Sequence, residues 1–214
     1  MGALRRIRFA ALGALALLTT ACISVDVGKD TAQQAQFRIV DGGATPVAAT
    51  RSSGRDLIVA AQPSSSVDDS FSLAFSRQPN QRAAYQFATW NDRPSNRLAQ
   101  LVVDRLAARR SFASVALAGR GIGGDVQLNL SVNDFYHDAA ATPGTARVEV
   151  AAELVDRSTR KLIARQTFAA SAPVNPANAA AAAAALGLAS TKVLDDLVAW
   201  TEAKAAPAAL ASAR

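Results

Sequence analysis

The stretch RVEVAAELVDRSTRKLIARQTF, residues 147–168, shows the plan of the fold most clearly. In each half of it, apolar residues occupy most alternate positions: Val148, Val150, Ala152 and Leu154, then Leu162, Ala164 and Phe168. A period of two is typical of a strand with one buried face. Residues 156–161, between the halves, hold serine, threonine and charged residues, which predict a short hairpin connection. We therefore expect two antiparallel strands with one face on a core.

Further strands are expected upstream of this hairpin. The same alternation occurs over residues 126–132, where Val126, Leu128, Leu130 and Val132 share one face. Shorter apolar or alternating runs bounded by glycine, proline or serine predict strands at residues 37–40, 57–61, 71–75, 85–90 and 112–117.

Two segments have helical periodicity instead. The first follows Trp90, and its apolar residues fall on one helical face: Leu98, Leu101, Val102 and Leu106. Asp92 is the expected N-cap of this helix, and Pro94 fits its first turn. The second helix is expected over residues 178–202, with one apolar stripe: Leu186, Val193, Leu194, Leu197 and Trp200.

The order of strands, helix, strands and helix predicts an α+β fold. We expect a single domain in which two main helices pack on one face of a mostly antiparallel sheet. The expected organisation is a lipoprotein signal peptide, a lipidated N-terminus with linker, the folded domain and a flexible tail, at residues 1–21, 22–35, 36–203 and 204–214.

The N-terminal residues have the composition of an export signal. Three arginines precede an apolar run at residues 9–18, and small residues follow up to Cys22: Arg5, Arg6 and Arg8, then Thr19, Thr20 and Ala21. The apolar run is about half the roughly 20 residues that a membrane-spanning helix needs. A cleaved signal is therefore expected rather than a permanent span.

Cys22 is the single cysteine of the 214 residues, so it has no disulfide partner in this chain. Its place directly after the small residues of the signal predicts a lipid attachment site. Thr19 stands where lipoprotein signals usually carry leucine. The alternative is simple secretion after Ala21, with Thr19 and Ala21 as the small residues that the peptidase recognises.

The charge excludes a nucleic-acid partner. The full chain has 23 Lys and Arg against 17 Asp and Glu, a formal net charge of +6. Residues 1–21 hold three arginines and no acidic residue, so their removal leaves +3. The remaining basic residues are scattered or in short clusters that are typical of a solvated face.

Motifs that could carry catalysis, a cofactor or a metal are weak. GRGIGG, residues 119–124, fits a dinucleotide pattern, but it leads into a strand rather than a helix, so a turn is expected. His137 is the single histidine and is expected at the surface near a strand end. Asp195 and Asp196 point about 100° apart on a helix and cannot share a site. We predict no catalytic, cofactor-binding or metal-binding residue.

The two tryptophans are interpreted as packing residues. Trp90 ends an expected strand beside the cap of the first helix, and Trp200 lies near the end of the second. Large aromatic residues dominate both cores and interfaces, so a partner contact is the alternative for each.

Three stretches together resemble a known family: residues 68–115, which contain TWNDRP and the first helix; residues 147–174, with LVDRSTR; and LDDLVAW, residues 194–200. They are similar to the ABC-type transport auxiliary lipoproteins, which accompany MCE-protein lipid transporters of the Mla and Pqi types. Ser95 departs from the family pattern, which often has a second proline in this helix.

The resemblance implies a non-catalytic, periplasm-facing lipoprotein that docks such a transporter to a membrane and assists movement of lipid or another hydrophobic molecule. It implies that Cys22 is acylated, with chains such as palmitate. The implied partners are an MCE-domain protein, a permease and an ATPase on separate chains, and the membrane through the anchor; a homo-oligomer is compatible with this role. Ile23, where an aspartate would be an inner-membrane signal, favours the outer membrane over the inner.

Two other functions remain open. The folded body could carry a lipid between sheet and helices, which requires an apolar cavity. It could instead be an assembly lipoprotein of another envelope complex, with the same anchor and fold but another partner.

Overall fold

Strand β6 (Val126–Asp138) is the strand around which the sheet of the computed structural model is built. The structure describes residues 33–43, 49, 52–62 and 67–206. The expected signal peptide, Cys22, nearly all of the linker and most of the tail lie outside the described residues.

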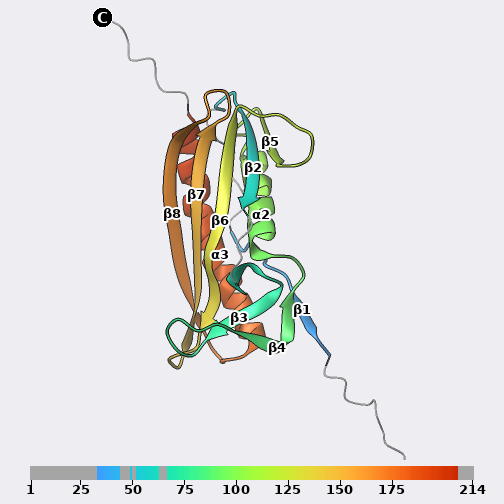
Figure 1. Ribbon diagram of the computed structural model, residues 1–214, viewed down its shortest axis with the longest axis vertical. Coiled ribbons are helices and arrows are strands. Elements are labelled where there is room, and N and C mark those ends of the chain that lie inside the picture. Colours follow the sequence, from blue (N-terminus) through green and yellow to red (C-terminus); the bar gives the residue numbers. More distant parts are fainter. Residues whose placement is uncertain (1–32, 44–48, 50–51, 63–66, 207–214) are drawn as a thin grey trace, which may run out of the picture. The chain divides into compact units, whose positions relative to one another are not determined.

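The described elements follow the expected order of strands and helices (Figure 1). They are β1 (Ala35–Phe37), β2 (Asp56–Gln62), a short 3-10 turn η1 (Val67–Asp69), β3 (Ser72–Ser76), β4 (Ala83–Trp90), helix α2 (Pro94–Arg109), β5 (Ser114–Leu117), β6, β7 (Gly144–Asp156), β8 (Lys161–Val174) and helix α3 (Ala179–Ala205).

One edge of β6 pairs along its length with β7, and β7 pairs in turn with β8; both pairings are antiparallel. The other edge of β6 is shared between two shorter strands, β2 beside its first half and β3 beside its last residues, and both are parallel to it. A bulge between Val132 and Asp134 separates these two halves. Beyond them the sheet continues through β5 on one side and through β4 and β1 on the other.

The predicted α+β class, with one mixed and mostly antiparallel sheet and two main helices, is confirmed. Antiparallel pairing accounts for most of the paired residues because β6, β7 and β8 are the longest described strands. The parallel pairings β1–β4, β2–β5, β2–β6 and β3–β6 were not foreseen. Each joins strands that are not consecutive in the chain, so the intervening elements return the chain to the starting end of the sheet, as parallel pairing requires.

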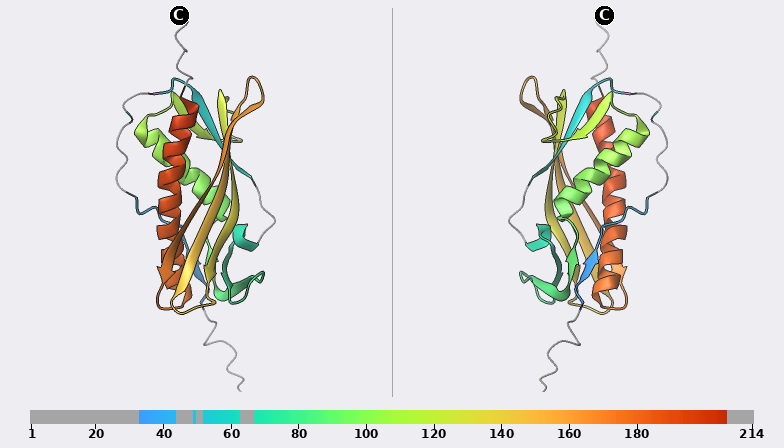
Figure 2. Two further views of the ribbon diagram at one scale, coloured as in Figure 1. Left: turned by 90° about the vertical axis from the view of Figure 1, so that its left-hand side faces the viewer. Right: turned by 90° about the vertical axis from the view of Figure 1, so that its right-hand side faces the viewer.

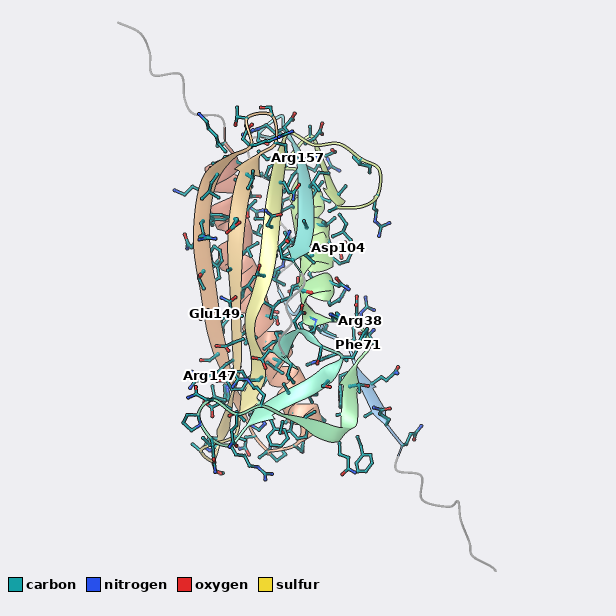
Figure 3. The ribbon with its side chains drawn as sticks, viewed as in Figure 1. Arg38, Phe71, Asp104, Arg147, Glu149 and Arg157 are labelled. Carbon is teal, nitrogen blue, oxygen red and sulfur yellow. The ribbon has the colours of Figure 1, made fainter. Side chains whose placement is uncertain are left out.

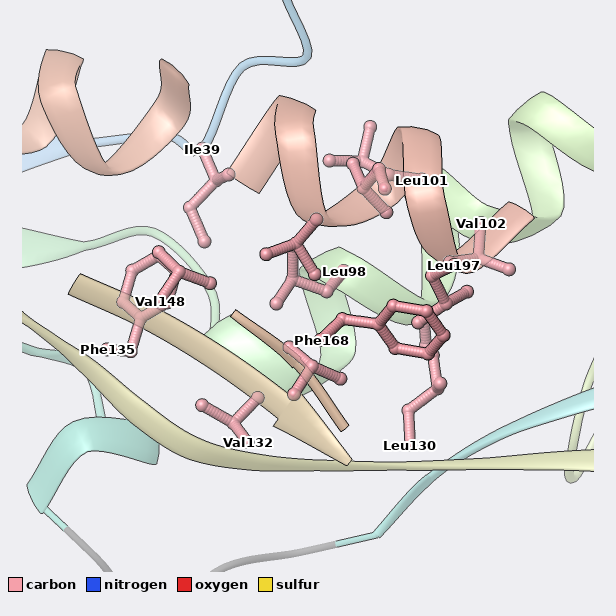
Figure 4. Packing of buried hydrophobic residues seen from close by; sticks show 14 of the residues in the cluster. Ile39, Leu98, Leu101, Val102, Leu130, Val132, Phe135, Val148, Phe168 and Leu197 are labelled. Carbon is pink, nitrogen blue, oxygen red and sulfur yellow. The ribbon is translucent and has the colours of Figure 1, made fainter. Parts of the chain in front are cut away.

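Helices α2 and α3 cover the same face of the sheet (Figure 2). Their predicted apolar faces are buried, and so are the inward residues of β6 and β7. Both tryptophans pack as expected: the Trp90 ring meets Phe135 edge-on at 5.5 Å, and the Trp200 ring meets Phe168 at 5.7 Å. Figure 4 shows this core between the sheet and the two helices, with Leu98 of α2 and Leu197 of α3 within it.

The expected N-cap of α2 is wrong. Arg93 is the N-cap residue, and its side chain makes no capping hydrogen bond, while Pro94 occupies the first turn as predicted. Asp92 instead accepts the backbone N–H of Arg93 through its carboxylate, at 2.7 Å. The carboxylate of Asp69, in η1, accepts the backbone N–H of Ser95 at 2.8 Å. A residue distant in sequence therefore satisfies a donor of the first helical turn that a local cap would otherwise serve.

Helix α3 begins on a local cap. Asn178 has an extended backbone, and its side-chain oxygen accepts the N–H of Ala181 at 2.9 Å. This is the ordinary N-cap arrangement, and it agrees with the predicted start of the helix.

The GRGIGG stretch is the turn that we expected. It connects β5 to β6, which lie on opposite edges of β2 and run in the same direction, so the chain must double back between them. Gly119 and Gly121 have φ of 84° and 71°, in the left-handed region that glycine tolerates best. The motif therefore serves the connection and does not open a nucleotide-binding helix.

Candidate docking surface

After β1 the chain runs against helices α2 and α3. We call residues 38–43 the N-terminal strap. Ile39 of the strap is buried in the core (Figure 4). The carbonyl oxygen of Val40 lies 3.3 Å from the position that a Cβ on Gly187 of α3 would occupy. The glycine therefore allows the strap backbone to approach the helix closely.

Arg105 of α2 joins the strap to both helices. Its Nε and Nη2 each donate to a carboxylate oxygen of Asp41 in the strap, both at 2.6 Å, and its Nη1 donates to Asp195 of α3 at 2.5 Å. The Arg105 side chain is 10% exposed, and its bidentate geometry is the strong form of such a pair. Hydrogen bonds from Arg105 hold the pKa of Asp41 below its ordinary value.

The same arginine also forms an ion pair with Asp195. Asp195 and Asp196 were expected not to form a shared site, and Asp195 is engaged with Arg105 in an ion pair. Its side chain is 59% exposed, whereas that of Asp41 is 19% exposed. Water screens an exposed pair strongly, so Asp41 is the more important partner of Arg105.

Further hydrogen bonds fix the strap along its length. Thr191 of α3 accepts the backbone N–H of Gly42 at 3.0 Å through its hydroxyl oxygen. Arg97 of α2 donates through Nε to the carbonyl oxygen of Ile39 at 3.1 Å. The segment that leads from the linker is therefore attached to α2 and α3 by side-chain bonds as well as by packing.

A shallow groove of about 450 Å³ runs between the strap and the first half of α3. Its walls are mainly apolar and include Phe37, Val40, Ala184 and Leu188. Val40 is 64% exposed and Leu188 is 59% exposed, so two large apolar side chains face solvent here. The described chain thus presents an apolar surface directly after the point where it begins.

The prediction of a surface histidine is wrong. His137 lies at the end of β6 as expected, but its side chain is fully buried. Its Nδ1 is hydrogen-bonded to the Tyr85 hydroxyl at 2.7 Å, and its Nε2 is buried with no hydrogen-bond partner beside the Cα of Gly144. Burial lowers the pKa of His137, which favours the neutral imidazole. The bulge after Val132 reverses the alternation, so Phe135 and His137 face inward although the period of residues 126–132 would place them outward.

The described residues offer no candidate metal site. Within them, no group of histidine, cysteine, aspartate and glutamate side chains is arranged to hold a metal ion. Of the described helices, none combines the length and hydrophobicity that crossing a membrane requires. Cys22, the one predicted site residue, lies outside the described residues, so its lipidation stays a prediction.

Comparison with known proteins assigns the family. Residues 69–198 match the ABC-type transport auxiliary lipoprotein component, and the chain belongs to this family. The matched region runs from η1 to the second half of α3, so it includes the sheet core, α2 and the hairpin that shows the resemblance. The recognition made from the sequence is confirmed.

Solved structures agree with this assignment. A protein of Xanthomonas campestris from the DUF330 family is similar with a TM-score of 0.71 and 27% identity, over 79% of this chain and 96% of that one. An uncharacterized protein has a TM-score of 0.60 at 12% identity, over 78% of this chain and 98% of that chain, which supports the fold alone. Comparison with curated proteins finds no match.

Family membership assigns the chain to the transport-associated lipoproteins of the cell envelope. The family is a transport component and is not defined by a catalytic activity.

We predict that Asp41→Asn lowers the free energy of unfolding by about 2 kcal/mol, because Arg105 loses its bidentate partner at a largely buried position. Asp195→Asn is the matched control and should cost less than about 1 kcal/mol, because that carboxylate is mostly exposed. Urea denaturation at pH 7 measures both. Equal losses in the two variants would contradict the central place of the Asp41–Arg105 pair.

We also predict a pH dependence of stability that comes from His137. Its pKa is lower in the folded protein than the ordinary 6.5, so as the pH falls below about 6.5 the unfolded chain binds a proton that the folded protein does not. Stability should therefore be full above pH 6.5 and decline below it, by at most about 1.4 kcal/mol per pH unit, until the folded pKa is reached.

His137→Gln removes the single imidazole of the chain. The variant should have a flatter profile than the wild type between pH 7 and pH 5 in urea denaturation, whatever its absolute stability. Parallel profiles for the two proteins would show that His137 is not buried in its neutral form.

Proposed function

We propose that this protein is the lipid-anchored, non-catalytic subunit of an MCE-type ABC transport system, and that it docks the transporter to a membrane. The observation that carries the proposal is the family match over residues 69–198, together with a single cysteine placed after a predicted export signal. The anchor holds one end of the chain in a leaflet of the outer membrane, and the folded body faces the periplasm.

The division of the chain suits a docking subunit. Acyl chains on Cys22 hold the protein at the membrane, and the polar residues up to Gln34 give the body reach. Tethering raises the local concentration of the body near the transporter, so a modest interface is sufficient for a persistent contact. The strap, bonded to α2 and α3, is suited to pass any force on the tether into the folded body.

The partners in this proposal are an MCE-domain protein, a permease and an ATPase. ATP hydrolysis and membrane passage belong to those chains, since the sequence has no P-loop motif. The substrate is a lipid or another hydrophobic molecule that moves between the inner and outer membranes.

The prediction is that the intact protein, extracted from its own membranes in mild detergent after crosslinking, copurifies with an MCE protein and its permease and ATPase. Mass spectrometry of the purified material identifies these chains. Cys22→Ser, which removes the acylated thiol, should reduce their recovery sharply while the folded body remains intact by circular dichroism.

Other outcomes would replace the proposal. A preparation without any transporter chain, even after crosslinking, would contradict the docking role. Stoichiometric lipid bound to such a preparation would favour the carrier, and other envelope proteins in its place would favour an assembly lipoprotein.

A further inference from the structure

Exposed apolar side chains gather around β1. Four large apolar residues with 49% to 64% exposure adjoin this strand: Val40, Phe71, Phe87 and Leu188. Phe87 precedes Ala88, the partner of Ala35 in β1. The carbonyl oxygen of Phe71 accepts the N–H of Trp90, which is paired with Phe37 of β1. Val40 and Leu188 flank the groove on the helical side of the same strand, whereas Phe87 alternates with the buried Ala88 and Trp90 and faces the other side of the sheet. The exposed apolar side chains therefore border the β1 edge of the sheet from both of its faces.

Arginine side chains accompany these apolar residues. Arg38 follows β1 directly and is exposed, in the lower half of the view in Figure 3. The guanidinium of Arg93 lies 5.8 Å from the centre of the Phe71 ring. Aromatic rings beside exposed arginines are the composition that proteins use at the headgroup level of a membrane.

The distribution of charged residues along α3 also distinguishes the two ends of the body. From Ala179 to Thr191, the half that borders the groove, the helix has no charged residue. Its second half carries Lys192, Asp195, Asp196, Glu202 and Lys204. The uncharged half therefore lies at the β1 end of the body, and the charged half lies toward the end where Arg157 is labelled in Figure 3.

The position of the chain start identifies the occupant of this surface. The described chain begins at Gln33, two residues before β1, and residues 22–33 span at most about 40 Å when fully extended. A bilayer that holds Cys22 therefore stays within about 40 Å of the start of the described chain, beside β1. An apolar surface beside the tether meets that bilayer more often than any free partner in solution.

We propose that the surface formed by Val40, Leu188, Phe71 and Phe87, with Arg38 and Arg93, rests on the lipid bilayer that holds the anchor. The proposal depends on the lipid anchor of the proposed function. The apolar side chains enter the headgroup region, and the arginines bind lipid phosphates. The opposite end, with the β7–β8 turn and the end of α3, then faces away from the membrane and is free to meet the transporter.

The contact is weak without the tether, because only a few side chains take part and no span exists among the described helices. This contact sets the orientation of the body, while the lipid anchor keeps the body at the membrane. Orientation matters for a docking subunit, because it fixes which end a partner chain can reach.

The test uses the natural scarcity of cysteine. In the acylated protein the Cys22 sulfur is consumed by the lipid, so an introduced cysteine is the single free thiol. Leu188→Cys and Phe87→Cys place a nitrobenzoxadiazole fluorophore on the proposed surface. Leu162→Cys is the matched control, because Leu162 is 56% exposed and lies at the opposite end of the sheet.

The labelled full-length proteins are purified from membranes and reconstituted in vesicles of phosphatidylethanolamine and phosphatidylglycerol. Nitroxide-labelled lipids should quench the probes at 188 and 87 at least about twofold more than the probe at 162, with a blue-shifted emission, because the first two lie in the headgroup region. Equal quenching at all three positions, or none at 188 and 87, would overturn the proposal.

The intact mass of the purified protein reports separately on the anchor. If Cys22 carries no acyl chains, the anchor of the proposed function fails. The membrane-facing surface is then tested with the same labelled variants carrying Cys22→Ser, held on nickel-chelating vesicles through an N-terminal histidine tag. Stronger quenching at 188 and 87 than at 162 would still support the membrane-facing surface, and its absence would overturn that surface too.

Discussion

Arg105 is the residue through which the N-terminal strap, α2 and α3 are held together. Its guanidinium lies at a largely buried position and donates to Asp41, 64 residues earlier, and to Asp195, 90 residues later. A buried arginine is costly unless its donors are satisfied, so this arrangement fixes the path of the strap across the helices. The groove beside α3 exists because the strap follows that path, and Gly187 lets the two backbones approach. The groove within the surface through which we expect the protein to meet its surroundings therefore depends in part on this ion-paired side chain.

The sheet gives this helical layer a rigid support. The three long strands β6, β7 and β8 form an antiparallel unit, and their inward residues provide one side of the core. The shorter strands are added at the other edge of β6, and the bulge after Val132 lets β2 and β3 share that edge. His137 and Tyr85 lie at the end where β3, β4 and β6 meet, and their hydrogen bond is a polar contact inside an otherwise apolar region. Such an interior group favours one register of these strands, since a shift would leave both polar atoms unpaired.

In our proposal, the function of the protein is to position a transporter at a membrane. Membership of the auxiliary lipoprotein family associates the chain with an ABC transporter. In our proposal, one end of the body is committed to the bilayer and the other end to the transporter. The strap is then the mechanical connection between lipid and body, and the contacts of Arg105 and Thr191 resist its removal from the helices. A rigid connection converts a flexible tether into a defined orientation.

The sequence by itself determined the features that depend on neighbours in the chain. The alternation in residues 147–168 predicted the β7–β8 hairpin, the 3.6-residue period predicted both helical faces, and Asn178 marked the start of α3, because each signal arises within a few residues. The tertiary structure alone decided the rest. Asp69 caps α2 from 26 residues away in place of Asp92, His137 is buried against Tyr85 from 52 residues away, and β2 adds parallel to β6. Local patterns carry no information on such partners, because their free energy arises only when distant segments pack together.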